Sequence, residues 1–96
     1  MQITYSKPCK HMKDLCKELG PDYSIRMIDL EQVIYCDFGN GYDVEISRMN
    51  NSSLKKRASI YLWKDASRIV ETVHDVPQCD IGDRVEELYA LTQEGV

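Results

Sequence analysis

The change in hydrophobic period along the chain is the feature that most limits what it can fold into. Apolar residues recur at the helical spacing of about 3.6 near both ends, and at the strand spacing of about 2 from Tyr23 to Val73. A helix, several short strands and a second helix are therefore expected in that order. We predict an α+β fold in which a four- or five-stranded antiparallel sheet carries both helices on one face.

The two helices have recognisable ends. The first is predicted from Lys7 to Leu19, because Ser6 can cap it and Gly20 ends it. The second is predicted from Ile81 to Leu91, with Asp80 as its N-cap. The apolar stripes expected to be buried are Cys9, Met12, Leu15, Cys16 and Leu19 in the first helix, and Ile81, Val85, Leu88, Tyr89 and Leu91 in the second.

The strands between the helices are short and are separated by turn signals. They are predicted at Ser24 to Ile28, Gln32 to Phe38, Tyr42 to Ser47 and Arg57 to Trp63, with Arg68 to Val73 as a fifth if the first one pairs. The Gly39-Asn40-Gly41 tripeptide supplies positive φ angles for a hairpin between the second and third strands. Alternation leaves one sheet face toward solvent, carrying Tyr35, Asp37, Asp43, Glu45, Tyr61 and Trp63.

Length and composition indicate one domain over residues 1–96. A chain of 96 residues with 43% hydrophobic residues can bury a single core and is not expected to be disordered. No apolar run is long enough for a signal peptide or a membrane helix, so we expect a cytoplasmic protein without membrane contact. In that reducing compartment the four cysteines are expected to be free thiols.

Charge is distributed unevenly along the chain. The net charge is −4 overall, with +4 over residues 50–70 and −6 over residues 71–96. A dedicated nucleic-acid-binding domain is more often basic as a whole. This distribution favours a protein partner over direct binding of DNA or RNA.

The cysteines and one histidine invite a zinc interpretation. Cys9, His11 and Cys16, completed by Cys36 or Cys79, contain the right ligand types. However, Cys9 and Cys16 are separated by about 10 Å along an intact helix, and one metal ion cannot reach both. We therefore interpret the cysteines as core residues and expect no metal and no cofactor.

Cys79, His74 and Asp75 are the only candidates for nucleophilic catalysis. All three lie on one short connection before the second helix, and no glycine-rich turn accompanies them to form an oxyanion site. A polar connection leading into a helix explains the same residues. No enzymatic activity is predicted.

A basic segment offers one binding surface. Arg48, Lys55, Lys56 and Arg57 precede a strand that places two rings on the predicted open face. Cations for phosphate and the rings of Tyr61 and Trp63 for base stacking suit single-stranded nucleic acid, the alternative function. The same lysines also fit a solvated loop that protects a sheet edge from aggregation.

An acidic set offers the other binding surface. It comprises Asp75 before the second helix and Asp80, Asp83, Glu86 and Glu87 with that helix, joined by Asp37, Asp43 and Glu45 on the sheet. Carboxylates on a rigid surface can imitate phosphates and occupy a basic groove, while Tyr35, Tyr61 and Trp63 supply apolar anchors. Alternatively, the carboxylates only solvate the surface, and the aromatic patch is covered by a second copy in a homodimer.

The order of elements resembles the double-stranded RNA-binding domain, and the Leu19-Gly20-Pro21-Asp22-Tyr23 junction looks like the turn after its first helix. That family carries lysines at the start of its last helix, where Asp80 and Asp83 stand here. The function is therefore not transferred.

The same architecture, in a short acidic chain, is similar to small inhibitors made by phages and mobile elements, including anti-CRISPR proteins. The resemblance spans Ser6 to Leu91 in architecture and charge. It implies a stoichiometric inhibitor without cofactor, whose acidic residues face a basic site on a host effector such as a Cas9-type nuclease. The leading hypothesis is accordingly a non-enzymatic interaction protein.

Overall fold

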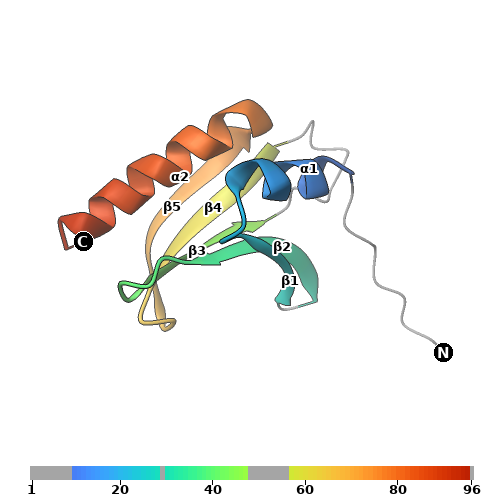
Figure 1. Ribbon diagram of the computed structural model, residues 1–96. Coiled ribbons are helices and arrows are strands. Elements are labelled where there is room, and N and C mark those ends of the chain that lie inside the picture. Colours follow the sequence, from blue (N-terminus) through green and yellow to red (C-terminus); the bar gives the residue numbers. More distant parts are fainter. Residues whose placement is uncertain (1–9, 29, 48–56, 96) are drawn as a thin grey trace.

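A computed structural model describes residues 10–28, 30–47 and 57–95 of the chain. Its elements follow one another as α1 (Lys10–Leu19), β1 (Ser24–Ile28), β2 (Glu31–Asp37), β3 (Tyr42–Ser47), β4 (Arg57–Lys64), β5 (Arg68–Pro77) and α2 (Gln78–Gln93). Figure 1 shows α2 running alongside β4 and β5, with α1 near β1 and β2. The predicted helix, sheet, helix order and the α+β class are confirmed.

Helix α1 ends where the sequence indicates. Gly20 adopts a φ of 116°, which only glycine adopts readily, and its N–H donates to the Cys16 carbonyl at 3.3 Å. Met12 and Leu15 are buried, as the apolar stripe predicts. The predicted start at Lys7 and the proposed core residue Cys9 lie outside the described residues.

All five strands form one antiparallel meander in the order β1-β2-β3-β4-β5. The conditional fifth strand is therefore present, and β1 pairs along its whole length with β2. The hairpin between β2 and β3 also forms as predicted, with φ angles of 77° at Gly39 and 90° at Gly41.

Strand β5 is longer than its sequence pattern predicts. The alternation breaks after Val73, yet pairing with β4 continues to Pro77. A β-bulge explains the difference, because Asp75 adopts a φ of 56° and the register shifts between Ala58 and Ile60. The inserted residue disturbs the period of two without ending the strand.

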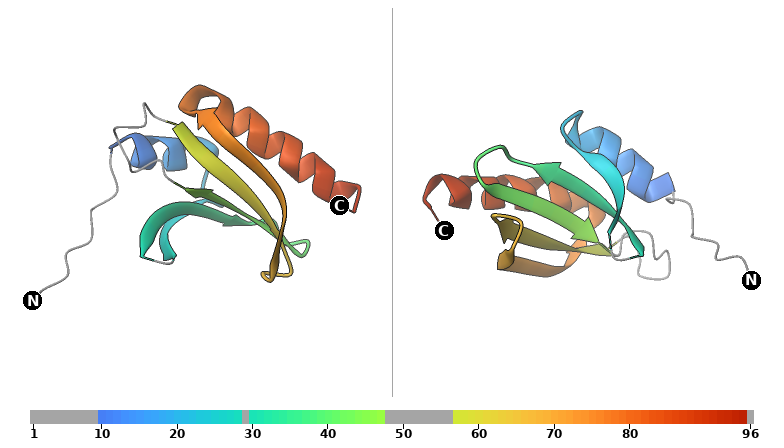
Figure 2. Two further views of the ribbon diagram at one scale, coloured as in Figure 1. Left: turned by 180° about the vertical axis from the view of Figure 1, so that it is seen from behind. Right: turned by 90° about the horizontal axis from the view of Figure 1, so that it is seen from below.

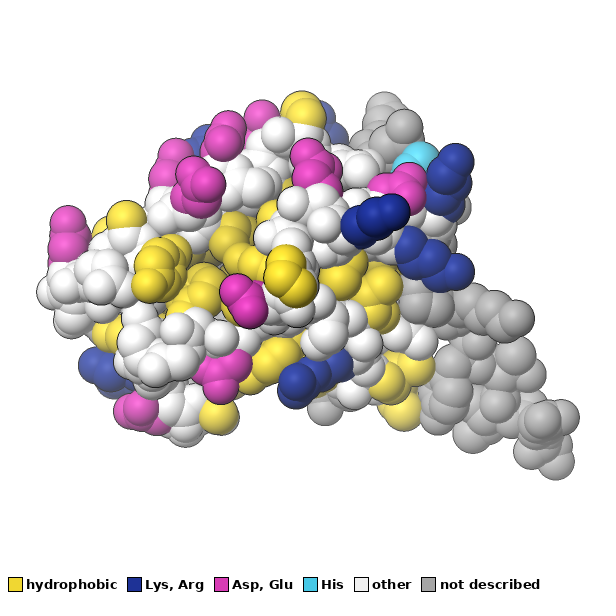
Figure 3. Space-filling view, in the orientation of Figure 1, with side chains coloured by type: hydrophobic (Ala, Val, Ile, Leu, Met, Phe, Trp, Pro, Cys, Tyr) yellow, Lys and Arg dark blue, Asp and Glu magenta, His cyan; other side chains and the backbone are white. Residues whose placement is uncertain are grey.

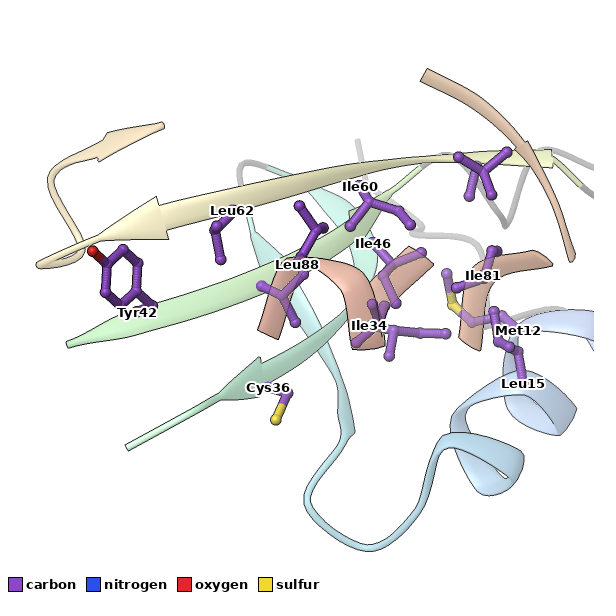
Figure 4. Packing of buried hydrophobic residues seen from close by; sticks show 14 residues of the cluster. Met12, Leu15, Ile34, Cys36, Tyr42, Ile46, Ile60, Leu62, Ile81 and Leu88 are labelled. Atoms are coloured by element: carbon purple, nitrogen blue, oxygen red, sulfur yellow. The ribbon is translucent and has the colours of Figure 1, made fainter. Parts of the chain in front are cut away.

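The core joins both helices to alternate residues of the sheet. Ile34, Ile46 and Ile60 are fully buried and are cross-strand neighbours on β2, β3 and β4. Figure 4 shows Met12 of α1 and Ile81 of α2 close to these isoleucines. Burial of this set supplies the main hydrophobic stabilisation of the described fold.

Helix α2 differs from the prediction at both ends. It starts at Gln78, with Pro77 in the N-cap position and no side-chain capping hydrogen bond, so the assignment of Asp80 as N-cap was wrong. Asp80 instead lies in the first turn, where its negative charge interacts favourably with the positive end of the helix dipole. Ile81, Val85 and Leu88 are buried as predicted. Tyr89, expected in the buried stripe, is 43% exposed.

The sheet is curved, and both of its edges contribute to one hollow on the face opposite the core. Ile28 of β1 and Ile69 of β5 line this hollow of about 370 Å³ together with Glu45 and Tyr61. Figure 2 shows β1 and β2 bending away from β4 and β5. Strand twist and bulges produce such curvature. Among the described helices, none is long and apolar enough to cross a membrane.

Candidate functional site

The exposed side of α2 is strongly acidic. Four carboxylates and one arginine lie along the helix, and all four acidic residues are exposed. Arg84 donates to the Glu87 carboxylate at 2.9 Å, so one positive charge offsets one of the four negative charges. The members of this acidic face are Asp80, Asp83, Glu86 and Glu87.

A hollow of about 330 Å³ lies beside the acidic face and joins residues that are distant in the sequence. Its lining comes from the turn after α1, from the end of β2 and from α2. Figure 3 shows hydrophobic side chains in the hollowed centre of the molecule, with carboxylates along the outer side of α2. The lining residues are Asp22, Tyr23, Cys36, Asp37, Phe38, Val85, Glu86 and Tyr89.

Three aromatic rings form the walls of this hollow. Phe38 and Tyr89 meet edge to face, with ring centroids 5.1 Å apart and planes at 79°. Tyr23 is positioned by the turn that follows α1, where its N–H donates to the Gly20 carbonyl at 3.2 Å. Phe38 directly follows β2, where its N–H donates to the Tyr42 carbonyl at 3.0 Å, and Tyr89 belongs to α2. The packing of α2 against the sheet therefore determines the spacing of the walls.

The hollow disfavours added negative charge. Burial raises the pKa of the Tyr23 hydroxyl most. Its interaction with the Cys36 side chain and the negative charges of Asp22 and Glu86 raise this pKa further. Burial likewise raises the pKa of the Cys36 thiol, with a contribution from the charge of Asp22. Tyr23 and Cys36 therefore stay neutral near neutral pH, and the carboxylates carry the charge of the site.

The second predicted surface, on the sheet face opposite the core, is less exposed than the sequence indicates. Tyr35, Tyr61 and Trp63 are half-buried. Glu45 lies between Tyr35 and Tyr61 in the cross-strand register, and Asp43 is opposite Trp63. These rings are therefore less exposed than predicted, and their role as partner anchors stays a prediction.

Tyr35 has charged partners on this sheet face. The Arg26 guanidinium lies 4.4 Å from the centre of its ring, a cation–π distance. Burial, followed by a hydrogen bond with Asp43, raises the pKa of the Tyr35 hydroxyl to about 12. These contacts already occupy part of the Tyr35 surface within the fold.

The structure thus separates the predicted partner-binding residues into two surfaces. Glu86 lines the hollow beside α2, and Asp80, Asp83 and Glu87 lie on the same helix. Asp43, Glu45 and the three rings belong to the sheet face opposite the core. Asp37 lies at the boundary between the two surfaces, because it lines the hollow and is also the cross-strand neighbour of Asp43.

The basic alternative is only partly within the described residues. Arg48, Lys55 and Lys56 lie outside them. Arg57 donates from Nη1 to the Asp75 carbonyl oxygen at 3.0 Å, and the same nitrogen lies 3.4 Å from Asp75 Oδ2. This arginine stabilises the bulge in β5.

The candidate nucleophile and metal residues have other contacts. His74 Nδ1 lies 3.1 Å from Ser59 Oγ, and the Cys79 thiol donates to Asp80 Oδ1 at 3.7 Å. No group of three or more histidine, cysteine or acidic side chains within the described ranges is placed to hold a metal ion. Cys36 is buried and Cys16 is half-buried, in agreement with their interpretation as core residues, whereas Cys79 is exposed and that interpretation is wrong for it.

Sequence reasoning missed four contributors to the hollow. Asp22 and Tyr23 were read only as part of a turn, Phe38 as a core residue and Tyr89 as part of the buried stripe. One signal was available: each ring lies within three residues of a carboxylate, namely Asp22, Asp37 or Glu86. That these pairs meet depends on packing between separate elements.

Comparison of this chain with protein-family models, with curated proteins and with solved structures found no match.

Proposed function

We propose that this chain is a non-enzymatic interaction protein that binds a basic surface of another protein through the acidic face of α2 and the hollow beside it. One observation carries the proposal: the exposed face of α2 carries Asp80, Asp83 and Glu87, and its neighbour Glu86 lines an aromatic hollow. Charge attracts a basic partner, and the rings supply the apolar contact area that charge alone lacks.

We infer in addition that both helices cover the same face of the sheet. Met12 and Leu15 of α1 belong to the same buried cluster as Ile81 of α2, and this cluster includes only one alternation set of β2 and β3. With that arrangement, the hollow lies between the two helices over the end of β2. A partner could then approach it without disturbing the core.

The partner class follows from the geometry of the charges. Residues Asp83 and Glu87 are one helical turn apart, and Asp80 precedes them by a further turn, so their carboxylates form a row. Rows of negative charge at such intervals resemble a phosphate backbone. A basic nucleic-acid-binding groove on a host effector, such as a Cas9-type nuclease, is our proposed target, with the chain acting as a phage or mobile-element inhibitor.

Charge reversal on α2 tests the proposal. The combined Asp83→Lys, Glu86→Lys and Glu87→Lys variant is compared with a charge-matched control, Asp14→Lys, Glu31→Lys and Glu71→Lys, which changes three exposed carboxylates outside α2. Each protein is immobilised and used to capture partners from a bacterial lysate, with and without nuclease treatment and at low and high salt, and circular dichroism verifies folding. The captured protein is identified and its affinity is measured in purified form.

The expected result is a salt-sensitive protein partner that is retained by the control and lost with the α2 variant. Equal retention by both folded variants would remove the acidic face from the mechanism. Retention that disappears with nuclease treatment would instead support binding to nucleic acid.

The alternative, a small nucleic-acid-binding module, has less support from the described residues. Carboxylates of Asp43 and Glu45 lie on the same sheet face as Tyr61 and Trp63, where they would repel phosphate. Arg57, from the basic set, already contacts Asp75. Quenching of the single tryptophan by oligonucleotides at low salt would revive this function.

A further inference from the structure

We propose that the hollow beside α2 binds the guanidinium group of an arginine side chain. The inference rests on the proposed function, because it identifies which side chain of a basic partner enters the site. The juxtaposition of three aromatic rings with three carboxylates carries it. The rings are Tyr23, Phe38 and Tyr89, and the carboxylates are Asp22, Asp37 and Glu86.

The carboxylates reach the hollow from three different elements. Asp22 comes from the turn after α1, Asp37 from the end of β2 and Glu86 from the middle of α2. No lysine or arginine is among the lining residues, and neither of the salt bridges between described residues involves these three side chains. Asp37 Oδ1 accepts a hydrogen bond from the Gly39 N–H at 2.8 Å, which orients that carboxylate. The local charge is therefore negative and is not balanced by a cation of the lining.

The rings make the site selective for a flat cation. Phe38 and Tyr89 are already packed edge to face, so they form a wall that needs little reorganisation. Aromatic faces attract cations, and arginine is the protein cation that stacks on them most often. At about 330 Å³ the hollow is large enough for a guanidinium group and the adjoining methylenes.

Arginine fits this combination better than lysine does. A guanidinium is planar, weakly hydrated and always charged, and its five N–H donors can serve several carboxylates while its faces contact rings. An ammonium group is compact and strongly hydrated, so entering an aromatic hollow costs it more hydration. The apolar floor formed by Val85 and Cys36 increases that difference.

The test uses the full chain and a short probe rather than the unidentified partner. Acetyl-Ala-Arg-Ala-amide is titrated into the ¹⁵N-labelled protein, and amide shifts are followed by NMR, with the lysine analogue as the competing probe. We expect saturable shifts at Tyr23, Phe38, Glu86 and Tyr89, and weaker binding of the lysine peptide by about threefold or more.

Two glutamates on different elements provide a matched pair of variants. Glu86→Gln removes a carboxylate from the hollow and is expected to weaken arginine-peptide binding about three- to tenfold. Glu71→Gln removes the same charge from an exposed carboxylate on β5, outside both the acidic face and the hollow, so binding should be nearly unchanged. Tyr89→Phe, which keeps the ring, should bind like the native chain, whereas Tyr89→Ala should bind more weakly.

Specific outcomes overturn the inference. Absence of a saturable shift, equal affinity for the arginine and lysine peptides, or equal weakening by Glu86→Gln and Glu71→Gln would each do so. Failure of the proposed function is separately recognisable. In that case the arginine peptide binds at the hollow, yet no basic protein is captured in an α2-dependent way.

Discussion

A side-chain hydrogen bond connects the tip of the β2–β3 hairpin to the C-terminal part of α2. Its contribution to the free energy of unfolding can be measured. Asn40 Nδ2 donates to Thr92 Oγ1 at 3.0 Å, and the Thr92 hydroxyl in turn donates to the Tyr89 carbonyl at 2.6 Å. Asn40 Oδ1 also accepts from the Tyr42 N–H at 3.2 Å. Since Thr92 is only 6% exposed, water cannot easily replace its partner.

A double-mutant cycle isolates this bond. Asn40→Ala removes the bonds to Thr92 and Tyr42 and is expected to lower the free energy of unfolding by about 1–2 kcal/mol, taking each as about 0.5–1.5 kcal/mol and allowing for the exposure of Asn40. Thr92→Val keeps the side-chain shape and removes the hydroxyl. Because the Tyr42 and Tyr89 bonds cancel in the cycle, the remaining coupling should be about 1 kcal/mol.

Urea unfolding followed by circular dichroism measures the four free energies. A coupling of about 1 kcal/mol corresponds to roughly 4–8 °C in melting temperature for a domain of this size. Additive effects within about 0.3–0.5 kcal/mol would show that Asn40 and Thr92 do not interact in solution. The position of the hairpin tip against α2 would then need another explanation.

Two further predictions concern stability. Ala66 adopts a φ of 54° in the β4–β5 turn, so Ala66→Gly should raise the free energy of unfolding by about 0.5–1 kcal/mol in urea titrations, and a decrease would contradict the strained turn. Tyr35, with its pKa raised to about 12, stabilises the fold fully below about pH 10, where the unfolded hydroxyl begins to ionise, and this contribution is lost as the pH rises toward 12. Between about pH 9.5 and 11.5, the free energy of unfolding of Tyr35→Phe should therefore fall less than that of the native chain. Identical slopes of this free energy against pH for both proteins would refute the role of Tyr35.

Features that depend on neighbouring residues were predicted well from the sequence. Gly39 and Gly41 indicated a hairpin because glycine readily adopts the positive φ angles that the turn requires. The alternation around Ile34 and Ile60 identified the buried sheet face, since side chains on a strand point to opposite sides in turn. Gly20 likewise marked the end of α1.

Local patterns failed where distant segments decide the structure. Pairing with Arg57 to Trp63 extends β5 through a bulge to Pro77, and α2 follows directly, so Asp80 does not cap the helix. Tyr61 and Trp63 are half-buried, although each lies on the non-core face as its parity indicates, and Tyr61 contacts the ring of His74 on β5. Burial on an open sheet face depends on twist accumulated over all strands, which no short window of sequence contains.

The sequence by itself determined the element order, the hairpin and the acidic character of the last helix, because spacing, glycine conformation and side-chain charge are local properties. Only the tertiary structure decided which acidic residues share a surface. Asp22, Asp37 and Glu86 meet at one hollow because α2 packs its buried stripe on the core beside the end of β2. Asp43 and Glu45 point to the other sheet face because strand geometry alternates, and Asp37, the cross-strand neighbour of Asp43, lies where that face meets the hollow.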